Sequence, residues 1–208
     1  MSSSADQQRS QPPPKGDDWL LSFVGVLEAS GPRVLEVGCG PGRDAATLSE
    51  RGFEVVAFDR LPLLAAAERA PKADFLWADV SSQLPFRDGV FNGAVASLSL
   101  HYLPWEATRR AFSEIRRVVR EGGAFAFRVN ADDDVNHGAG EGEELERGFF
   151  CTPRPSYSET KRFFDEQMVW AAVEGLFEVE RLEHKTIHHH AEPKRVWECL
   201  ARAIRSEG

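Results

Sequence analysis

Residue types that could hold a small charged ligand are concentrated between positions 34 and 44. An apolar run ends at Glu36, and a glycine-rich turn and a segment of helical composition beginning at Asp44 follow it. Glycine lets the backbone approach a ligand because it has no Cβ. A helix start offers unpaired N–H groups and the positive end of the helix dipole. The pattern predicts a strand, a tight loop and a helix around a small-molecule site, with loop glycines Gly38, Gly40 and Gly42.

The residues around this loop indicate which ligand it holds. Dinucleotide-binding loops prefer G-x-G-x-x-G and place the pyrophosphate at the helix N-terminus. Here Arg43 stands where that pattern has its third glycine, and Glu36 lies two residues before the first. A carboxylate at that place suits an ammonium group, not a pyrophosphate. S-adenosylmethionine (SAM) carries an ammonium and a sulfonium group and no phosphate.

With these residues the chain resembles the class I SAM-dependent methyltransferases, whose first motif is E/D-x-G-x-G-x-G. The resemblance covers roughly residues 19 to 205. It implies SAM as cofactor, S-adenosylhomocysteine as product, and methyl transfer by in-line displacement to a small-molecule acceptor. It also implies cofactor contacts from Trp19, Glu36, Gly38, Cys39, Gly40, Gly42, Arg43, Asp44, Asp59, Arg60, Asp79, Val80, Ser97 and Leu98.

Two further acidic residues each end a short apolar run. Asp59 follows residues 53–58, where an acid can accept both hydroxyls of a ribose. Asp79 follows residues 75–78, and in the resembled family this place contacts the adenine amino group while the next backbone N–H, that of Val80, contacts the ring. The alternative for both aspartates is a helix cap or turn.

The acceptor is expected beyond the carboxyl ends of the strands. Residues 92–97 predict the fourth strand, which Leu98 to Leu103 follow. His101 could act as a general base because its ordinary pKa lies near neutrality, or it could be a buried histidine that shapes the wall. Residues expected near the acceptor are Tyr102, Arg128, Asn130, Arg162 and His188.

The arginines and histidine of this set favour an acceptor with negative charge or a lone-pair-rich atom. Residues 183–188 are also similar to the tail of the tellurite-resistance methyltransferases, in which a histidine followed by arginine lines the acceptor site. Here His189 stands in the arginine's place, which leaves specificity for chalcogen oxyanions open. We expect no metal at residues 188–190, because alternate side chains of a strand point to opposite faces.

Bulk properties narrow the class of protein. The formal net charge of −8 argues against a general electrostatic grip on nucleic acid. No apolar stretch is long enough to span a bilayer. The scattered cysteines indicate a reducing compartment, so we expect a cytoplasmic protein with no membrane or nucleic-acid partner, and the oligomeric state stays open. The three are Cys39, Cys151 and Cys199.

The order of elements predicts an α/β, Rossmann-like, seven-stranded, mainly parallel sheet with the last strand antiparallel and helices on both faces. We expect a disordered tail over residues 1–16 and a single domain over residues 17–208. Within it, the spacing of apolar residues predicts helices over 17–29 and 105–120, the second stopped by Gly122 and Gly123.

The region after residue 130 has no regular period. Residues 131–158 predict a long loop, and residues 131–164 a lid-like insertion that acts with the N-terminal helix. Asp165 can cap a helix that runs to about Val173, and strands are expected from Phe177 and over 196–201. Two classes rival the methyltransferase: a non-catalytic SAM-binding sensor or partner subunit, and a nicotinamide-dependent oxidoreductase.

Overall fold

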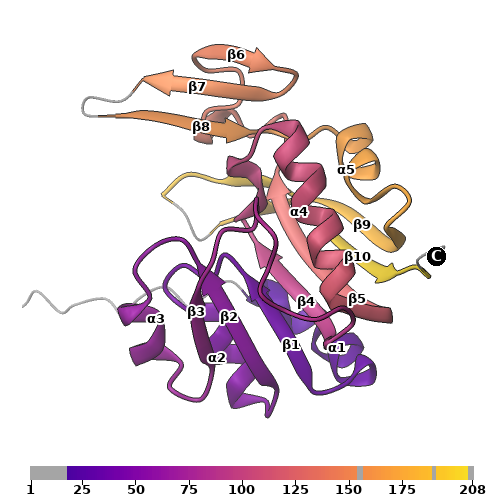
Figure 1. The fold of residues 1–208 in the computed structure, drawn as a ribbon. Coiled ribbons are helices and arrows are strands. Elements are labelled where there is room, and N and C mark those ends of the chain that lie inside the picture. The colour runs from indigo at the N-terminus through magenta and orange to yellow at the C-terminus, as the bar shows by residue number, and fades with distance from the viewer. Residues whose placement is uncertain (1–17, 154–156, 189–190, 206–208) are drawn as a thin grey trace, which may run out of the picture.

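The computed structural model describes residues 18–153, 157–188 and 191–205. The tail predicted over residues 1–16 lies outside them. Among the described residues, seven strands form one sheet in the order β3-β2-β1-β4-β5-β10-β9 (Figure 1). Its strands are β1 (Arg33–Val37), β2 (Glu54–Asp59), β3 (Asp74–Trp77), β4 (Phe91–Ser97), β5 (Val119–Asn130), β9 (Phe177–Ile187) and β10 (Lys194–Ala203).

The predicted sheet and its reversed last strand are confirmed. Strands β3, β2, β1, β4 and β5 pair in parallel, whereas β10 pairs antiparallel with both β5 and β9. β9 and β10 follow one another without a helix between them, and a short connection allows only an antiparallel pair. The last strand therefore enters the sheet between β5 and β9.

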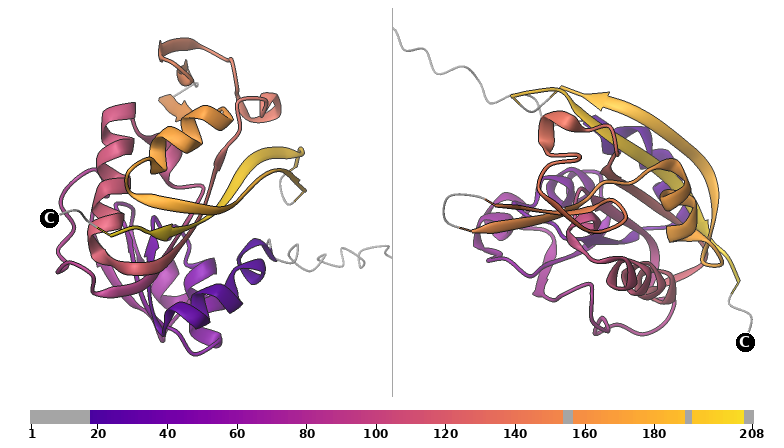
Figure 2. Two further views of the ribbon diagram at one scale, coloured as in Figure 1. Left: turned by 90° about the vertical axis from the view of Figure 1, so that its right-hand side faces the viewer. Right: turned by 90° about the horizontal axis from the view of Figure 1, so that it is seen from above.

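Helices cover both faces of the sheet. On one face α4 (Trp105–Val118) and α5 (Glu166–Val173) pack on a core that includes Phe125 and Phe127. On the other face lie η1 (Asp18–Ser22), α1 (Val24–Ser30), α2 (Arg43–Glu50) and α3 (Leu64–Arg69). In the left view of Figure 2, α4 and the indigo N-terminal helices lie on opposite sides of the strands.

Two predicted helix boundaries are wrong. The N-terminal segment is not one helix, because the 3₁₀ turn η1 and α1 meet at Phe23. α4 ends at Val118, and β5 begins at the next residue, so Gly122 and Gly123 lie inside a strand and do not stop the helix. A Cβ on Gly123 would lie 2.7 Å from the carbonyl oxygen of Asn92. Gly123 thus allows the close approach of β5 to β4, where the register shifts, and Gly122 has φ +72° beside it.

The expected long loop contains regular structure. Residues 131–164 hold the 3₁₀ turn η3 (Val135–His137) and a three-stranded antiparallel sheet of β6 (Glu143–Glu146), β7 (Phe149–Pro153) and β8 (Ser158–Arg162). Figure 1 shows this small sheet above α4 and the end of β5. Its strands are short, and the acidic sequence of β6 has low strand propensity. Pairing and packing, not local preference, determine their conformation.

Candidate active site

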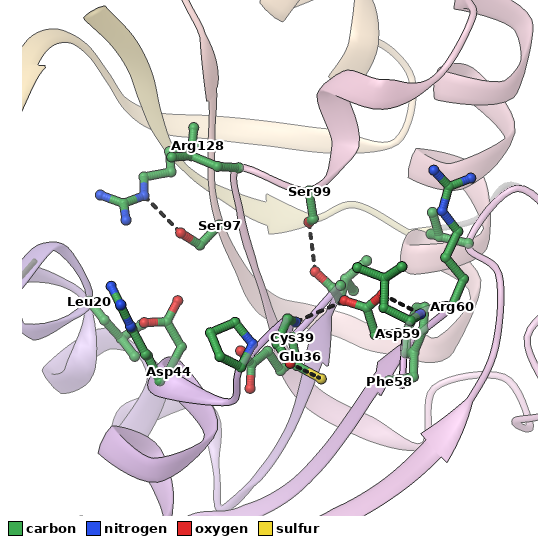
Figure 3. A pocket seen from close by; sticks show the side chains of 18 of the residues that line it. Leu20, Glu36, Cys39, Asp44, Phe58, Asp59, Arg60, Ser97, Ser99 and Arg128 are labelled. Carbon is green, nitrogen blue, oxygen red and sulfur yellow. Dashed lines mark hydrogen bonds between the residues drawn. The ribbon is translucent and has the colours of Figure 1, made fainter. Parts of the chain in front are cut away.

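A cavity of about 920 Å³ opens at the carboxyl ends of β1, β2 and β4 (Figure 3). Parallel strands bring their carboxyl ends to one edge, so residues far apart in sequence meet there. The lining consists of Leu20, Leu21, Glu36, Val37, Gly38, Cys39, Gly40, Pro41, Arg43, Asp44, Thr47, Arg51, Phe58, Asp59, Arg60, Leu61, Ala78, Asp79, Val80, Ser97, Leu98, Ser99, Tyr102, Leu103 and Arg128.

The glycine loop forms the floor of this cavity. The N–H groups of Gly38 and Cys39 both donate to the carbonyl of Phe58, at 2.9 and 3.0 Å. Gly38 has φ +68°, and a Cβ there would lie 2.4 Å from Cβ of Ser99. Gly40 has φ +48°, yet no atom lies within 4 Å of the place its Cβ would take. The first glycine allows close packing, and the second leaves space for a ligand.

Asp59 ties the loop to the end of β2. Its Oδ2 accepts from the N–H of Gly40 at 2.8 Å, and its Oδ1 accepts from the N–H of Leu61 at 2.9 Å (Figure 3). The carboxylate therefore has a fixed orientation at the cavity wall. Its free acceptor capacity suits a ribose hydroxyl, since an ionised carboxylate can accept more than two hydrogen bonds.

Glu36 is a buried acid with an unused acceptor atom. It is 4% exposed, and its Oε2 has no hydrogen-bond partner among the described residues. Burial is the main cause that raises the pKa of this carboxyl well above its usual value, and the negative charges of Asp44 and Asp59 add to the effect. Such an atom is costly unless a ligand donor meets it. An ammonium group would satisfy it and restore its charge.

Asp44 is held beside Glu36 by Trp19. The indole Nε1–H of Trp19 donates to both carboxylate oxygens, at 3.1 and 3.3 Å. Burial raises the pKa of Asp44 to about 6, although this hydrogen bond and Arg43 oppose the shift. Trp19 does not itself line the cavity, and neither does Gly42. Trp19 acts through its hydrogen bonds to Asp44, and Gly42 is the N-cap residue of α2.

The donor set fits SAM. Asp44 and Asp59 bring negative charge to the loop, and Glu36 adds to it once an ammonium group restores its charge. This charge attracts an ammonium and a sulfonium. The same charge would repel a pyrophosphate, which disfavours a dinucleotide in this loop.

Asp79 and Val80 line the cavity on the side of β3. The Oδ1 of Asp79 accepts from the N–H of Ser81 at 2.8 Å and from its hydroxyl at 2.7 Å. These hydrogen bonds are the main cause that lowers the pKa of Asp79. Only Oδ1 makes the turn, so the turn leaves the other oxygen for the adenine contact, which stays a prediction.

Two other predicted cofactor residues need separate mention. The Cys39 thiol has its pKa raised to about 12, mainly by burial. It therefore stays protonated and is packed in the loop. Arg60 is exposed at the mouth of the cavity, at the end of β2.

The predicted acceptor residues are only partly brought together. Tyr102 and Arg128 line the cavity, whereas Asn130 is fully buried outside the lining and His188 is exposed after β9. His101 is 2% exposed and also lies outside the lining. Burial lowers its pKa well below the usual value, and Lys194 and Lys161 contribute. His101 is therefore a buried residue that does not reach the cavity.

Arg162 does not reach the cavity. It is 1% exposed, its guanidinium pairs with Glu146, and it donates to the carbonyls of Leu103 at 3.3 Å and Arg147 at 2.7 Å. Arg162 lies outside the lining because the unpredicted small sheet holds it against the start of α4. Its predicted contact with the acceptor stays a prediction.

Several lining residues escaped the sequence interpretation. Ser99 donates its hydroxyl to the carbonyl of Val37 at 2.7 Å, which ties the end of β4 to the end of β1. Its neighbour Leu98, which the sequence did predict as a cofactor residue, has φ +52°, a rare conformation for a residue other than glycine. Leu20 and Leu103 add apolar wall. A serine just after a predicted strand was a usable signal, but nothing local marks the leucines.

Two negative findings concern the described residues only. No group of three or more histidine, cysteine, aspartate or glutamate side chains in them could hold a metal ion. His189 and His190, part of the histidine run, lie outside the described residues. None of the described helices is both long and apolar enough for a membrane crossing.

Comparison with known proteins decides the family. Residues 34–123 match the family model described as a methyltransferase domain. The malonyl-[acyl-carrier protein] O-methyltransferase of Salmonella typhimurium is 38% identical over 127 residues, which are 60% of this chain and 48% of that protein. A SAM-dependent methyltransferase from Methanosarcina mazei superposes with a TM-score of 0.71 at 20% identity, over 84% of this chain and 93% of that one.

The chain carries a class I SAM-dependent methyltransferase domain. A further structure of the same fold, Burkholderia thailandensis 1,6-didemethyltoxoflavin-N1-methyltransferase, contains S-adenosylhomocysteine. It has a TM-score of 0.67 at 20% identity and covers 91% of this chain and 80% of that one. The predictions of fold and family are confirmed. The chain spans about half the length of the curated relatives it matches.

Proposed function

We propose that the protein transfers a methyl group from SAM to a small-molecule acceptor. The observation that carries this proposal is the buried, unpaired Glu36 carboxylate oxygen beside a glycine loop with open space at Gly40. The cavity of about 920 Å³ lies at the upper end of the range for small-molecule sites. That size suits a cofactor with a compact acceptor beside it.

Different residues of the cavity would bind different parts of the cofactor. Glu36 and Asp44 would hold the ammonium group, Asp59 the ribose, and Asp79 with the Val80 N–H the adenine. SAM supplies an activated methyl group on its sulfonium sulfur. The protein's task is to align that methyl group with the acceptor and to exclude water, which are the main catalytic effects available for an in-line displacement.

We propose that the acceptor supplies its own nucleophile. A general base must lie within hydrogen-bond reach of the proton that it removes. His101, the predicted base, lies outside the lining and is held neutral by burial. The acids of the cavity belong to the cofactor. Next to the apolar wall, Tyr102 and Leu103 remain for acceptor contacts, and Tyr102 is 39% exposed.

We propose that the small sheet of β6, β7 and β8 acts as a lid over the acceptor side. Glu146 accepts from the N–H of Trp105 at 2.6 Å and pairs with Arg162, so the sheet is fastened at the start of α4. Leu103, whose carbonyl also receives Arg162, lines the cavity. Hydrogen exchange in β7 and β8 should slow when S-adenosylhomocysteine binds. Equal exchange in both states would leave the sheet as an inert insertion.

The experiment for the main proposal is an acceptor screen with SAM, read as S-adenosylhomocysteine formed and as product mass. The panel contains small acids, phenols, amines and thiols. It also includes a malonyl group on an acyl carrier protein, because relatives are named for that substrate. Asp59→Asn should raise the KM for SAM and lower kcat/KM, whereas Asp74→Asn, an exposed acid at the start of the neighbouring strand β3, should leave both unchanged. Tight S-adenosylhomocysteine binding without turnover on any acceptor would favour the non-catalytic binding module instead.

A further inference from the structure

Arg128 lies at one end of the cavity, near the carboxyl end of β5. Its side chain is 7% exposed and lines the cavity. It is on the same sheet face as Ala126, which packs on the N-terminal helices. Figure 3 shows the guanidinium above Asp44 and Leu20, at the opposite end of the view from Asp59 and Arg60. Arg128 therefore belongs to the end of the cavity that is farther from the predicted ribose site.

Two contacts orient the guanidinium. Its Nε–H donates to the hydroxyl of Ser97 at 2.8 Å, and its Cζ lies 4.9 Å from the centroid of a Trp19 ring. The same Trp19 donates its indole N–H to Asp44. One tryptophan thus contacts both the cation and the acid. This shared contact keeps a positive and a negative group close together at one end of the cavity.

The charge of Arg128 is buried at the site. Burial lowers its pKa to about 10, and Glu198 opposes this shift, so the group stays protonated at neutral pH. Glu198 is the register partner of Arg128 on β10, and it also accepts a hydrogen bond from Lys185 at 3.0 Å. A desolvated cation at a ligand cavity favours an anion of the ligand.

We propose that Arg128 binds the carboxylate of the methionine end of SAM and not the methyl acceptor. The inference rests on the cofactor orientation of the proposed function, with the ribose at Asp59. The methionine end then reaches Glu36, Asp44 and Arg128. SAM carries two positive groups and a single carboxylate. An arginine beside it would repel the cofactor unless it met that carboxylate. Glu36 and Asp44 for the ammonium and Arg128 for the carboxylate together complement an α-amino acid.

The test compares two ligands that differ only in the carboxylate. They are S-adenosylhomocysteine and its decarboxylated analogue, which keeps the adenosine, the sulfur and the ammonium group. Calorimetry without any acceptor should show wild-type protein binding S-adenosylhomocysteine roughly 10- to 100-fold more tightly than the analogue, the range of one charge-assisted contact. Arg128→Gln should bind both ligands with similar affinity, and Arg128→Lys should keep part of the preference.

The matched control is Arg110→Gln. Arg110 is exposed on α4 and pairs with Glu106 at 3.8 Å, far in the chain from any lining residue on β1 or β2. It should keep the full preference for S-adenosylhomocysteine. Circular dichroism and thermal unfolding check that each variant is folded.

Two results would overturn the proposal. The first is that wild-type protein binds the decarboxylated analogue as tightly as S-adenosylhomocysteine. The second is that Arg128→Gln keeps the full preference for S-adenosylhomocysteine. A raised acceptor KM in that variant would then assign Arg128 to the acceptor. The proposed methyl transfer is judged separately, by product formation in the acceptor screen. Failure there with the ligand preference intact would leave the carboxylate assignment standing.

Discussion

The cofactor half and the acceptor half of this molecule use their polar residues differently. Around the glycine loop, buried acids remain available to a ligand: Oε2 of Glu36 has no partner among the described residues. Above α4 and the end of β5, the buried charges have protein partners: Arg162 pairs with the half-exposed Glu146, and Lys194 pairs with the buried Asp134 at 2.8 Å. A buried group left unsatisfied costs stability. An unsatisfied buried group is therefore expected where a bound ligand can pair with it. Where no ligand binds, buried polar groups pair within the protein.

The largest expected effect tests the acceptor half, where the buried charges are paired. Arg162→Ala removes the cation that joins Glu146, the Leu103 carbonyl and the aromatic rings of Trp105 and Phe149. Because Glu146 is half-exposed and can be solvated, the loss comes from the packing and hydrogen bonds of the buried guanidinium, and it should lower the free energy of unfolding by roughly 3 kcal/mol. Urea denaturation measures this. Arg110→Ala, an exposed arginine on α4, should change it by less than about 0.5 kcal/mol.

Affinity for S-adenosylhomocysteine should be unchanged in Arg162→Ala, because this arginine lies outside the cavity lining. A stable variant with a raised acceptor KM would instead place Arg162 in the acceptor site. That outcome would break the contrast between the two halves.

The second largest expected effect tests the cofactor half. Asp59→Ala removes the acceptor for the Gly40 and Leu61 N–H groups and the predicted partner of the ribose. Its S-adenosylhomocysteine affinity should fall by roughly 1–3 kcal/mol, the cost of unpaired polar groups. Isothermal calorimetry measures it, with Asp74→Ala as control. Binding equal to that of wild-type protein would remove the ribose assignment.

The third prediction concerns pH. Because the pKa of Asp44 is raised to about 6, its charge is lost as pH falls below 6. Affinity for S-adenosylhomocysteine should then fall by up to tenfold per pH unit, or about 1.4 kcal/mol. Titrations at pH 5 and 7 measure it. Asp44→Asn should reduce this pH dependence without removing it, because Glu36, whose pKa burial also raises, faces the same ammonium group. The ligand 5′-methylthioadenosine, which lacks the ammonium group, should show little pH dependence.

The folding stability of the ligand-free protein should change with pH in the opposite direction to the ligand affinity. In the unfolded chain the pKa of Asp44 has its ordinary value of 3.8, whereas in the folded protein burial raises this pKa to about 6. The folded state binds more protons in this window, so the contribution of Asp44 to stability falls as pH rises from about 4 to about 6. A rise over the same window in wild-type protein relative to Asp44→Asn would contradict this sign.

The smallest expected effect concerns the start of α5, in the acceptor half. Asp165 caps α5, with its Oδ1 accepting from the N–H of Met168 at 2.7 Å. Asp165→Ala should lower the free energy of unfolding by about 1 kcal/mol, and Asp165→Asn should retain most of the cap. Chemical denaturation measures both. No change in cofactor affinity is expected, since α5 contributes no residue to the cavity lining.

The sequence alone determined the cofactor half. The strand, the glycine loop, the helix start and the acids at 36, 59 and 79 are local signals, because each depends on a few adjacent residues at the end of a strand. The alternation of strands and helices fixed the parallel order, and the missing helix before β10 indicated its antiparallel pairing. The Asp165 cap was predicted and found for the same local reason.

Only the tertiary structure decided the acceptor half. Whether Arg162 lines the cavity or fastens a small sheet depends on β6 to β8, whose short strands are stabilised by pairing and not by propensity. Whether His101 faces the ligand or the core depends on the packing of η2 (Leu100–Tyr102) against its neighbours. Side-chain direction in these places follows from register and long-range contacts, which no local pattern of residues encodes.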